Sequence, residues 1–225
     1  ALKQSDKTYD IEKIQRAYEC AARFHDGQFR QSGEPYISHP VSVALILVGL
    51  GMDTDCLCAA LLHDVVEDTD ATLEGIRKQF GHDVALMVDG VTKLGQIPLT
   101  TKEEQQSENV RKMLLAMSED IRVIIIKLAD RLHNMRALSF KSEQKQREIS
   151  LETMEIYAPI AHRLGIRGVK EELEDLALRY LDPVGYKEIE DTLELKKPER
   201  EAFIVEIKAK IAERLKEYGI EPHIE

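Results

Sequence analysis

The sequence predicts an all-α protein, and three observations support this fold class. Apolar residues recur at helical spacing along the whole chain, beginning with Ile11, Ile14 and Ala17. No stretch of any length alternates apolar and polar residues as a half-buried strand would. Glycine and proline stand between the periodic runs, where helices begin and end. The 225 residues suffice for one sizeable core, or for one domain with an appendage.

The first half of the chain divides into short helices. Pro40 suits the first turn of a helix, and Asp53 or Thr54 can cap the helix that follows. In order, the expected elements are a helix ending at Gly27, a loop over 30–35, a helix over 41–48, a helix after residue 54 that carries residues 57–66, and two shorter helices over 72–80 and 82–94.

The second half contains one ambiguous segment. Residues 123–126 are Val-Ile-Ile-Ile and could form a buried strand, but Leu132 and Met135 continue the apolar pattern at helical steps and favour a helix. The other expected elements are a mobile loop over 95–107, a helix from Glu108, a helical run over 145–180 with a kink at Pro159, a break at Pro183 and Gly185, and a final helix over 198–218.

Composition excludes several functional classes. The formal net charge of −10 argues against a protein that coats nucleic acid, and 5% aromatic residues without tryptophan argue against base-stacking platforms. No apolar run approaches the roughly 20 residues of a membrane span, and no signal peptide is evident. The three cysteines lack CxxC spacing and suit buried thiols in a reducing compartment. We therefore expect a cytoplasmic protein.

Three histidines are followed directly by aspartate, and the second doublet differs in context. His25-Asp26 and His82-Asp83 fall at expected helix ends, where polar residues are common. His63-Asp64 instead lies inside a largely apolar segment and shares one helical sector with Glu67 and Asp68. Burying this much acid without a partner is costly, and a divalent cation would relieve the cost. The alternative is that this sector faces solvent.

Two more residues could join such a site. His39 lies where the polar loop meets the Pro40 helix, from which it could project into a cleft. Asp130 is a carboxylate within an otherwise apolar helix. An ion pair with Lys127 or Arg131 is the alternative explanation for Asp130.

The order His39, His63-Asp64, Asp130 resembles the signature of HD-domain metal-dependent phosphohydrolases, which are all-helical. The resemblance to the hydrolase domain of RelA/SpoT-type alarmone synthetase/hydrolases is closer and covers nearly the whole chain. It is carried by five segments: 30–40 (RQSGEPYISHP), 63–69 (HDVVEDT), 91–94 (VTKL), 127–136 (KLADRLHNMR) and 161–166 (AHRLGI).

The resemblance implies a reaction and a metal site. It assigns His39, His63, Asp64 and Asp130 to one Mn²⁺, an ion that can lower the pKa of a bound water. The acidic pair that follows the HD doublet would accept a proton from the attacking water or orient it, and the sequence does not tell which of Glu67 and Asp68 is the base. The implied reaction removes the 3′-pyrophosphate from ppGpp or pppGpp and gives GDP or GTP and pyrophosphate. Such a reaction would control the level of these alarmones in the stringent response.

The resemblance also implies nucleotide contacts. Arg30 would stack on guanine, since its guanidinium is flat, and Ser32 and Asn134 would form hydrogen bonds to the nucleoside. Two departures from the family pattern, Gln31 for lysine and Ala137 for threonine, could weaken binding without touching the metal set. The substrate-binding residues expected from the family are Arg30, Gln31, Ser32, Tyr36, Lys93, Asn134 and Arg136.

We expect two regions, a hydrolase core over 1–150 and a helical extension over 151–225 that leads toward a synthetase domain. Because no synthetase pattern follows and residue 1 is Ala, the chain is expected to be part of a longer protein with synthetase and regulatory domains. A stand-alone small hydrolase is the alternative. Neither a membrane nor a nucleic acid is an expected partner. The alternatives are an HD phosphohydrolase for another nucleotide and a non-catalytic regulatory module whose 198–218 helix docks on a partner.

Overall fold

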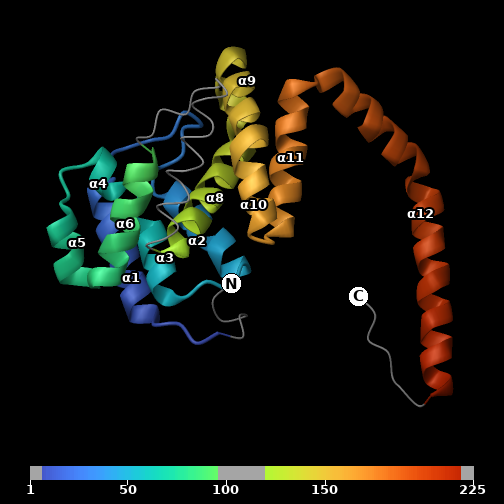
Figure 1. The fold of residues 1–225 in the computed structure, drawn as a ribbon, viewed down its shortest axis with the longest axis horizontal. Coiled ribbons are helices and arrows are strands. Elements are labelled where there is room, and N and C mark those ends of the chain that lie inside the picture. Colours follow the sequence, from blue (N-terminus) through green and yellow to red (C-terminus); the bar gives the residue numbers. More distant parts are fainter. Residues whose placement is uncertain (1–6, 96–119, 219–225) are drawn as a thin grey trace. The chain divides into compact units, whose positions relative to one another are not determined.

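The computed structural model describes residues 7–95 and 120–218, which are largely helical (Figure 1). Within these ranges no β-strand forms, and Phe29 and Pro35 make an isolated β-bridge. The all-α prediction is confirmed. In chain order the helices are α1 (Ile11–Phe24), α2 (Ser38–Gly49), α3 (Thr54–Leu62), α4 (Val65–Asp68), α5 (Leu73–Phe80), α6 (His82–Gly95), α8 (Ile121–Arg136), α9 (Glu143–Glu152), α10 (Ala158–Arg163), α11 (Arg167–Leu181) and α12 (Pro183–Glu217).

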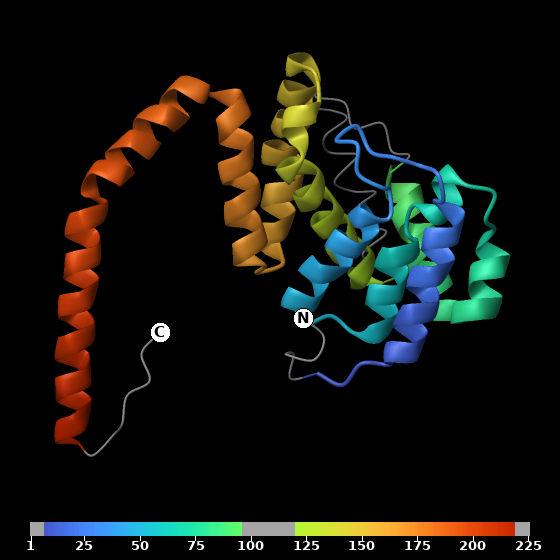
Figure 2. The same cartoon turned by 180° about the vertical axis from the view of Figure 1, so that it is seen from behind.

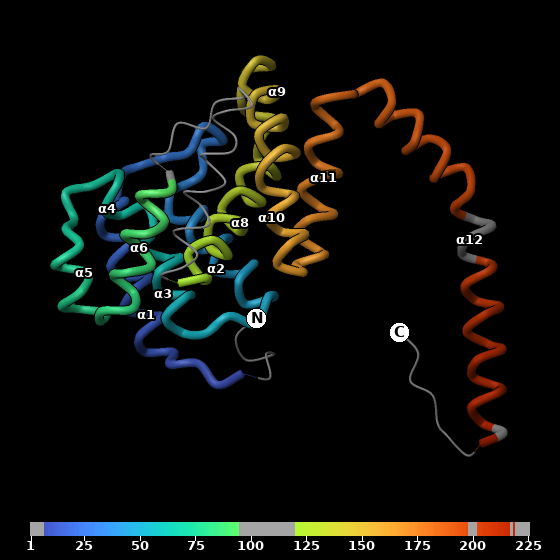
Figure 3. Tube along the Cα trace, viewed as in Figure 1, coloured from blue at the N-terminus to red at the C-terminus, as the bar shows by residue number. Residues whose placement is uncertain are grey.

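The chain forms two compact units, residues 1–181 and residues 182–225. In the first unit α9 and α10 pack beside α11, as the Cα trace shows (Figure 3). The hydrolase boundary expected at residue 150 stays a prediction. The loop expected over 95–107 and the helix expected from Glu108 lie, apart from Gly95, outside the described residues.

Helix α8 is the centre of the first unit. It packs against α2, α3, α6 and α11 (Figure 1, and from behind in Figure 2). Val123, Ile124, Ile126 and Leu128 are all buried within it. A helix covered on several sides needs apolar residues around most of its circumference, which explains why this segment resembled a strand in sequence. The helical interpretation is confirmed.

The segment around His63 differs from expectation, because it forms two helices instead of one. Helix α3 ends at Leu62 and α4 begins at Val65. His63 and Asp64, which lie between the two helices, keep right-handed helical backbone angles. Asp53 caps α3 by accepting a hydrogen bond from the Cys56 amide at 2.8 Å. The expected cap is confirmed.

Three expectations in the C-terminal part meet different outcomes. A π-helical turn over Thr153–Tyr157 interrupts the helical run just before Pro159, where a disturbance was expected because proline lacks an amide proton. The break expected at Pro183 is confirmed, since α11 ends at Leu181 and α12 begins at Pro183. The separate helix expected over 198–218 is wrong, because α12 continues without interruption from Pro183 to Glu217. Pro183 occupies the first turn, where a helix tolerates proline, and therefore starts α12.

The three cysteines Cys20, Cys56 and Cys58 are free and buried. Burial raises the pKa of the Cys56 and Cys58 thiols to about 12, which makes them poor nucleophiles. None of the described helices combines the length and apolar character that crossing a membrane requires.

Candidate functional site

Two imidazoles and two carboxylates meet where α2, the α3–α4 junction and α8 come together. His39 Nε2 lies 3.5 Å from Asp64 Oδ2 and 3.2 Å from Asp130 Oδ1. His63 Nε2 lies 3.1 Å from Asp64 Oδ1 and 4.0 Å from Asp130 Oδ1. Both histidines are almost fully buried, at 3% and 1% exposure. The structure therefore brings together all four residues that the sequence singled out as metal ligands.

In both imidazole rings, the Nδ1 atom has a fixed partner on the side away from the carboxylates. His63 Nδ1 lies 2.7 Å from the carbonyl oxygen of Ala60, so it carries the proton and donates. His39 Nδ1 lies 2.8 Å from His133 Nδ1. Fixing the Nδ1 side of an imidazole orients Nε2 and leaves its lone pair for a ligand bond.

Asp130 is buried and meets several partners. Lys127 Nζ lies 2.9 Å from its Oδ2, and Asn134 Nδ2 donates to Oδ1 at 2.7 Å. Burial opposes ionisation, but the Lys127 ammonium outweighs it and holds the pKa of Asp130 well below its usual range. The ion pair offered as an alternative explanation therefore exists, and the same carboxylate also faces the imidazoles.

The donor set fits a divalent cation. Among the described residues, His39, His63 and Asp130 offer ligand atoms that all lie within 4.8 Å of one another. The buried His63 Nε2 makes no hydrogen bond to any residue that the structure describes, which is costly unless a ligand completes it. Imidazole nitrogens with carboxylate oxygens suit borderline to hard divalent ions. The residues present thus fit a divalent metal without identifying which one.

The acidic pair on α4 lies beside this cluster, and its members have different surroundings. The Tyr36 hydroxyl lies 2.8 Å from Asp64 Oδ2 and 2.9 Å from Asp68 Oδ2, so its single proton is shared between them. Burial, and then these carboxylates, raise the pKa of Tyr36 and keep it protonated. Glu67 accepts no hydrogen bond from another described residue, and partial burial followed by the Asp64 charge raises its pKa.

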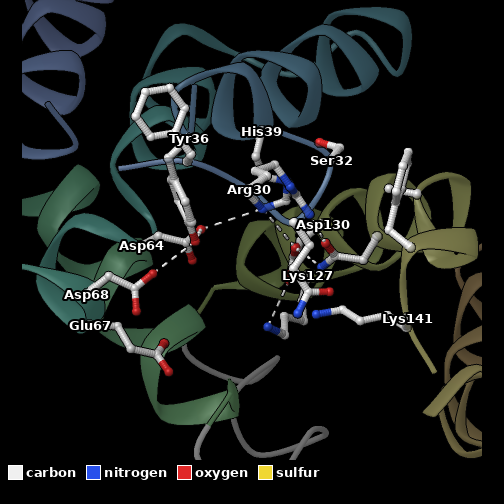
Figure 4. Close-up of a pocket in the computed structure, with 15 residues that line it drawn as sticks. Arg30, Ser32, Tyr36, His39, Asp64, Glu67, Asp68, Lys127, Asp130 and Lys141 are labelled. Carbon is white, nitrogen blue, oxygen red and sulfur yellow. Dashed lines mark hydrogen bonds and ion pairs between the residues drawn. The ribbon is translucent and has the colours of Figure 1, made fainter. Parts of the chain in front are cut away.

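The cluster opens into a pocket of about 450 Å³ (Figure 4). Asp64, Glu67 and Asp68 lie on one side of it, and Lys127 and Lys141 lie on the other. The full lining is Phe29, Arg30, Gln31, Ser32, Tyr36, His39, Asp64, Glu67, Asp68, Lys127, Asp130, Asn134, Ala137, Phe140 and Lys141. The pocket thus has an acidic wall and a basic wall, with the cluster between them.

Most of the expected substrate residues line this pocket. Arg30, Gln31, Ser32, Tyr36 and Asn134 all do, and so does Ala137. Arg30 Nη2 donates to Asn134 Oδ1 at 3.0 Å, which joins residues that are 104 positions apart. The loop after α1 and the last turns of α8 therefore form one wall together.

Two expected substrate residues do not line the pocket. Lys93 is an exposed residue of α6 that pairs with Asp89. Arg136 makes a two-point ion pair with Glu172, at 2.6 and 2.8 Å. A guanidinium held in this way would have to give up a good partner before it could bind phosphate. The structure therefore does not bring either side chain to the predicted substrate site.

Sequence reasoning overlooked several pocket residues and one neighbour. Lys141, Phe29 and Phe140 line the pocket, although no motif marked them. Lys127 was considered only as an ion-pair partner, yet it also lines the pocket. His133 lies three residues after Asp130 on α8, and this helical spacing was the available signal that it faces the cluster.

Comparison with known proteins gives consistent results. The HD domain family matches residues 17–167. The chain is 48% identical to the bifunctional (p)ppGpp synthase/hydrolase SpoT of Escherichia coli K12, over 98% of this chain and 32% of that protein. It is also 48% identical to a guanosine-3′,5′-bis(diphosphate) 3′-pyrophosphohydrolase of Aquifex aeolicus, over 95% of this chain and 30% of that protein.

A solved structure is similar as well. It is described as a metazoan ortholog of SpoT that hydrolyzes ppGpp, and it matches with a TM-score of 0.58 and 28% identity. The match covers 80% of this chain and 99% of that one. The chain spans about a third of the length of the curated relatives named above.

Proposed function

The chain belongs to the HD-domain family, and we propose that it hydrolyses the 3′-pyrophosphate group of ppGpp and pppGpp, giving GDP or GTP and pyrophosphate. The observation that carries the proposal is the buried cluster of His39, His63, Asp64 and Asp130 at the base of a pocket that is acidic on one side and basic on the other. Similarity to the guanosine-3′,5′-bis(diphosphate) 3′-pyrophosphohydrolases supports the substrate.

We propose Mn²⁺ as the ion, held by His39, His63, Asp64 and Asp130. When bound, the cation would supply Lewis acidity to the reacting phosphoryl group and to the attacking water. Lys127 and Asn134 hold the Asp130 carboxylate in place for this purpose. The buried Nε2 of His63, which makes no hydrogen bond within the described residues, supports the assignment.

Glu67 is proposed as the general base. Its carboxylate lines the pocket and accepts no hydrogen bond from another described residue, so it is available to take a proton from the attacking water. Its raised pKa makes it a stronger base than an ordinary glutamate. Asp68 instead shares the Tyr36 hydroxyl with Asp64. We propose that Asp68 holds this hydroxyl in place beside Asp64.

Substrate binding is assigned to the loop after α1 and to the basic wall. Arg30 is proposed to stack on guanine, with Ser32 and Asn134 as hydrogen-bonding partners of the nucleoside. Lys141 lines the pocket and has no described partner for its ammonium group, so it is proposed to bind phosphate in the role first expected of Lys93 and Arg136. Local positive charge is needed because the chain as a whole carries −10.

The proposal also places the enzyme in the cytoplasm, which the three free, buried cysteines support. In the full-length protein, synthetase and regulatory regions are proposed as partners, since the relatives are about three times as long as this chain.

The test is pyrophosphate release from ppGpp by metal-depleted protein with and without Mn²⁺. The wild type is expected to be active only with the ion, and Asp130→Ala inactive. Asp191→Ala, which removes an exposed carboxylate in α12, serves as the matched control and should keep full activity. Because Asp130→Ala leaves Lys127 unpaired, Asp64→Asn provides a second inactivating variant. Equal release by wild type and both site variants would refute the metal assignment.

Turnover of other nucleotides and binding of the alarmone separate the two alternatives. An HD phosphohydrolase for another nucleotide would turn over a nucleoside monophosphate or NADPH in preference to ppGpp, and Arg30→Ala would not affect ppGpp most strongly. A non-catalytic regulatory module would bind the alarmone persistently, with Mn²⁺ present, and release no product.

A further inference from the structure

We infer that His133 is a positioning residue that fixes the proton of His39 on Nδ1 and so presents His39 Nε2 to the metal. The inference rests on the proposed metal site and extends it to a residue outside the ligand set and outside the pocket lining. Two contacts carry it. His39 and His133 face each other through their Nδ1 atoms at 2.8 Å, and the Arg30 guanidinium approaches the same His133 nitrogen at 3.5 Å.

A hydrogen bond between two Nδ1 atoms needs one donor and one acceptor. The Arg30 guanidinium can only donate, so a proton on His133 Nδ1 would point toward a cation. His133 Nδ1 therefore keeps its lone pair and accepts, and His39 Nδ1 donates. The proton on Nδ1 leaves the lone pair of His39 on Nε2.

The tautomer matters because the proton of His39 could lie on Nε2 instead of Nδ1. Its Nε2 lies 3.2 Å from Asp130 Oδ1 and 3.5 Å from Asp64 Oδ2. Without a constraint at Nδ1, a proton on Nε2 could donate to these carboxylates and would occupy the position that the cation needs. His63 has no such freedom, since a backbone carbonyl holds its Nδ1 proton. His133 performs for His39 the task that the Ala60 carbonyl performs for His63.

The position of His133 favours positioning over substrate contact. Its ring does not line the pocket that contains Glu67 and Asp130. It lines instead a second hollow of about 510 Å³ between α2, α8 and α11. The rings of His39 and His133 lie with their centroids 4.8 Å apart, so packing as well as the hydrogen bond holds them together.

The test measures Mn²⁺ affinity of metal-depleted protein by isothermal titration calorimetry, without nucleotide. Asn and Leu are nearly equal in size, and an Asn amide oxygen can accept where Nδ1 accepts. His133→Leu is expected to bind Mn²⁺ about 10- to 100-fold more weakly than wild type, and His133→Asn within about threefold of it. His133→Phe, which keeps a ring without nitrogens, should match His133→Leu and covers the case in which the leucine variant fails to fold.

The control is His162→Leu, the same substitution at an exposed histidine in α10, which should bind Mn²⁺ as wild type does. Wild-type affinity in the Leu or Phe variant, or affinity in the Asn variant as weak as in the Leu variant, would overturn the inference. In that case the proposed hydrolysis stands if wild type still binds Mn²⁺ and releases pyrophosphate. A wild type that binds no Mn²⁺ overturns the inference and the proposed metal site together.

Discussion

Replacing Glu67 with glutamine should separate the two acids of α4, which the sequence leaves equivalent. Glu67 accepts no hydrogen bond from a described residue and has a raised pKa, whereas Asp68 is held by the Tyr36 hydroxyl. General-base catalysis contributes about 10²- to 10⁴-fold in rate. Glu67 is partly open to solvent, so a water molecule can take over part of its role as base in the variant. We therefore expect a loss of rate at the lower end of that range.

A fall of about 10²-fold in kcat corresponds to about 2.7 kcal/mol of lost transition-state stabilisation. Asp68→Asn should lower kcat less than about tenfold, because the asparagine oxygen can still accept from Tyr36 and only a charge is lost. Neither acid belongs to the proposed ligand set, so the Mn²⁺ affinity of both variants should stay within about threefold of wild type.

The assay is pyrophosphate release at saturating ppGpp and Mn²⁺, with calorimetric Mn²⁺ titration of each variant alongside. The titration separates loss of the base from loss of the ion. If Asp68→Asn proves more damaging to kcat than Glu67→Gln at equal metal affinity, the assignment of the base is wrong.

Three further outcomes are expected. Lys141→Ala should raise the KM for ppGpp about tenfold and leave kcat within about twofold, because its ammonium group is available to a phosphate; an unchanged KM in steady-state kinetics would contradict this. Hydrogen bonds from Arg122 lower the pKa of Asp120, so this carboxylate stabilises the fold above its unfolded pKa and ceases to do so as pH falls through its folded pKa. Asp120→Asn, which keeps an acceptor for the α8 cap, should therefore cost about 1 kcal/mol at pH 7 in urea unfolding and progressively less as the pH falls through the folded pKa of Asp120, and a cost that does not change with pH would argue against the ion pair. A Cβ at Gly90 would approach Val123 Cγ2 to 2.8 Å, so Gly90→Ala should destabilise by about 1–3 kcal/mol, and Val123→Ala added to it should cost less than the two single changes summed.

The helical fold could be predicted because its signals are local. Apolar spacing, the Asp53 cap and the helical continuation through Leu132 and Met135 depend on neighbours within a few positions. The same local rules misjudged Pro198, since a proline that begins a new helix and a proline within a continuous helix look alike in sequence. The HD-type fold expected from the family resemblance is confirmed by the family match.

Part of the candidate metal site could be anticipated because its residues are chemically unusual for their surroundings, and the family resemblance then supplied the set of four ligands. A histidine, an aspartate and two further acids in an apolar stretch need an explanation wherever the chain folds. Two residues that the family resemblance suggested for substrate binding, Lys93 and Arg136, lie away from the pocket and each pairs with a nearby acid. A sequence motif does not tell which acid a basic side chain meets in the folded protein.

By itself the sequence determined that the fold is helical and indicated the residue types at the candidate metal site, because helical periodicity and the cost of burying charge act at each position in turn. The packing of α2 and the α1–α2 loop against α8 decided the rest. It brings Arg30 to Asn134 and His39 to His133, pairs that are 104 and 94 positions apart. Such pairings depend on how whole helices dock, and no local pattern encodes which side chains then share a hydrogen bond. Only the tertiary structure could therefore show that Glu67 and Asp68 have different surroundings and reveal the partner of His39.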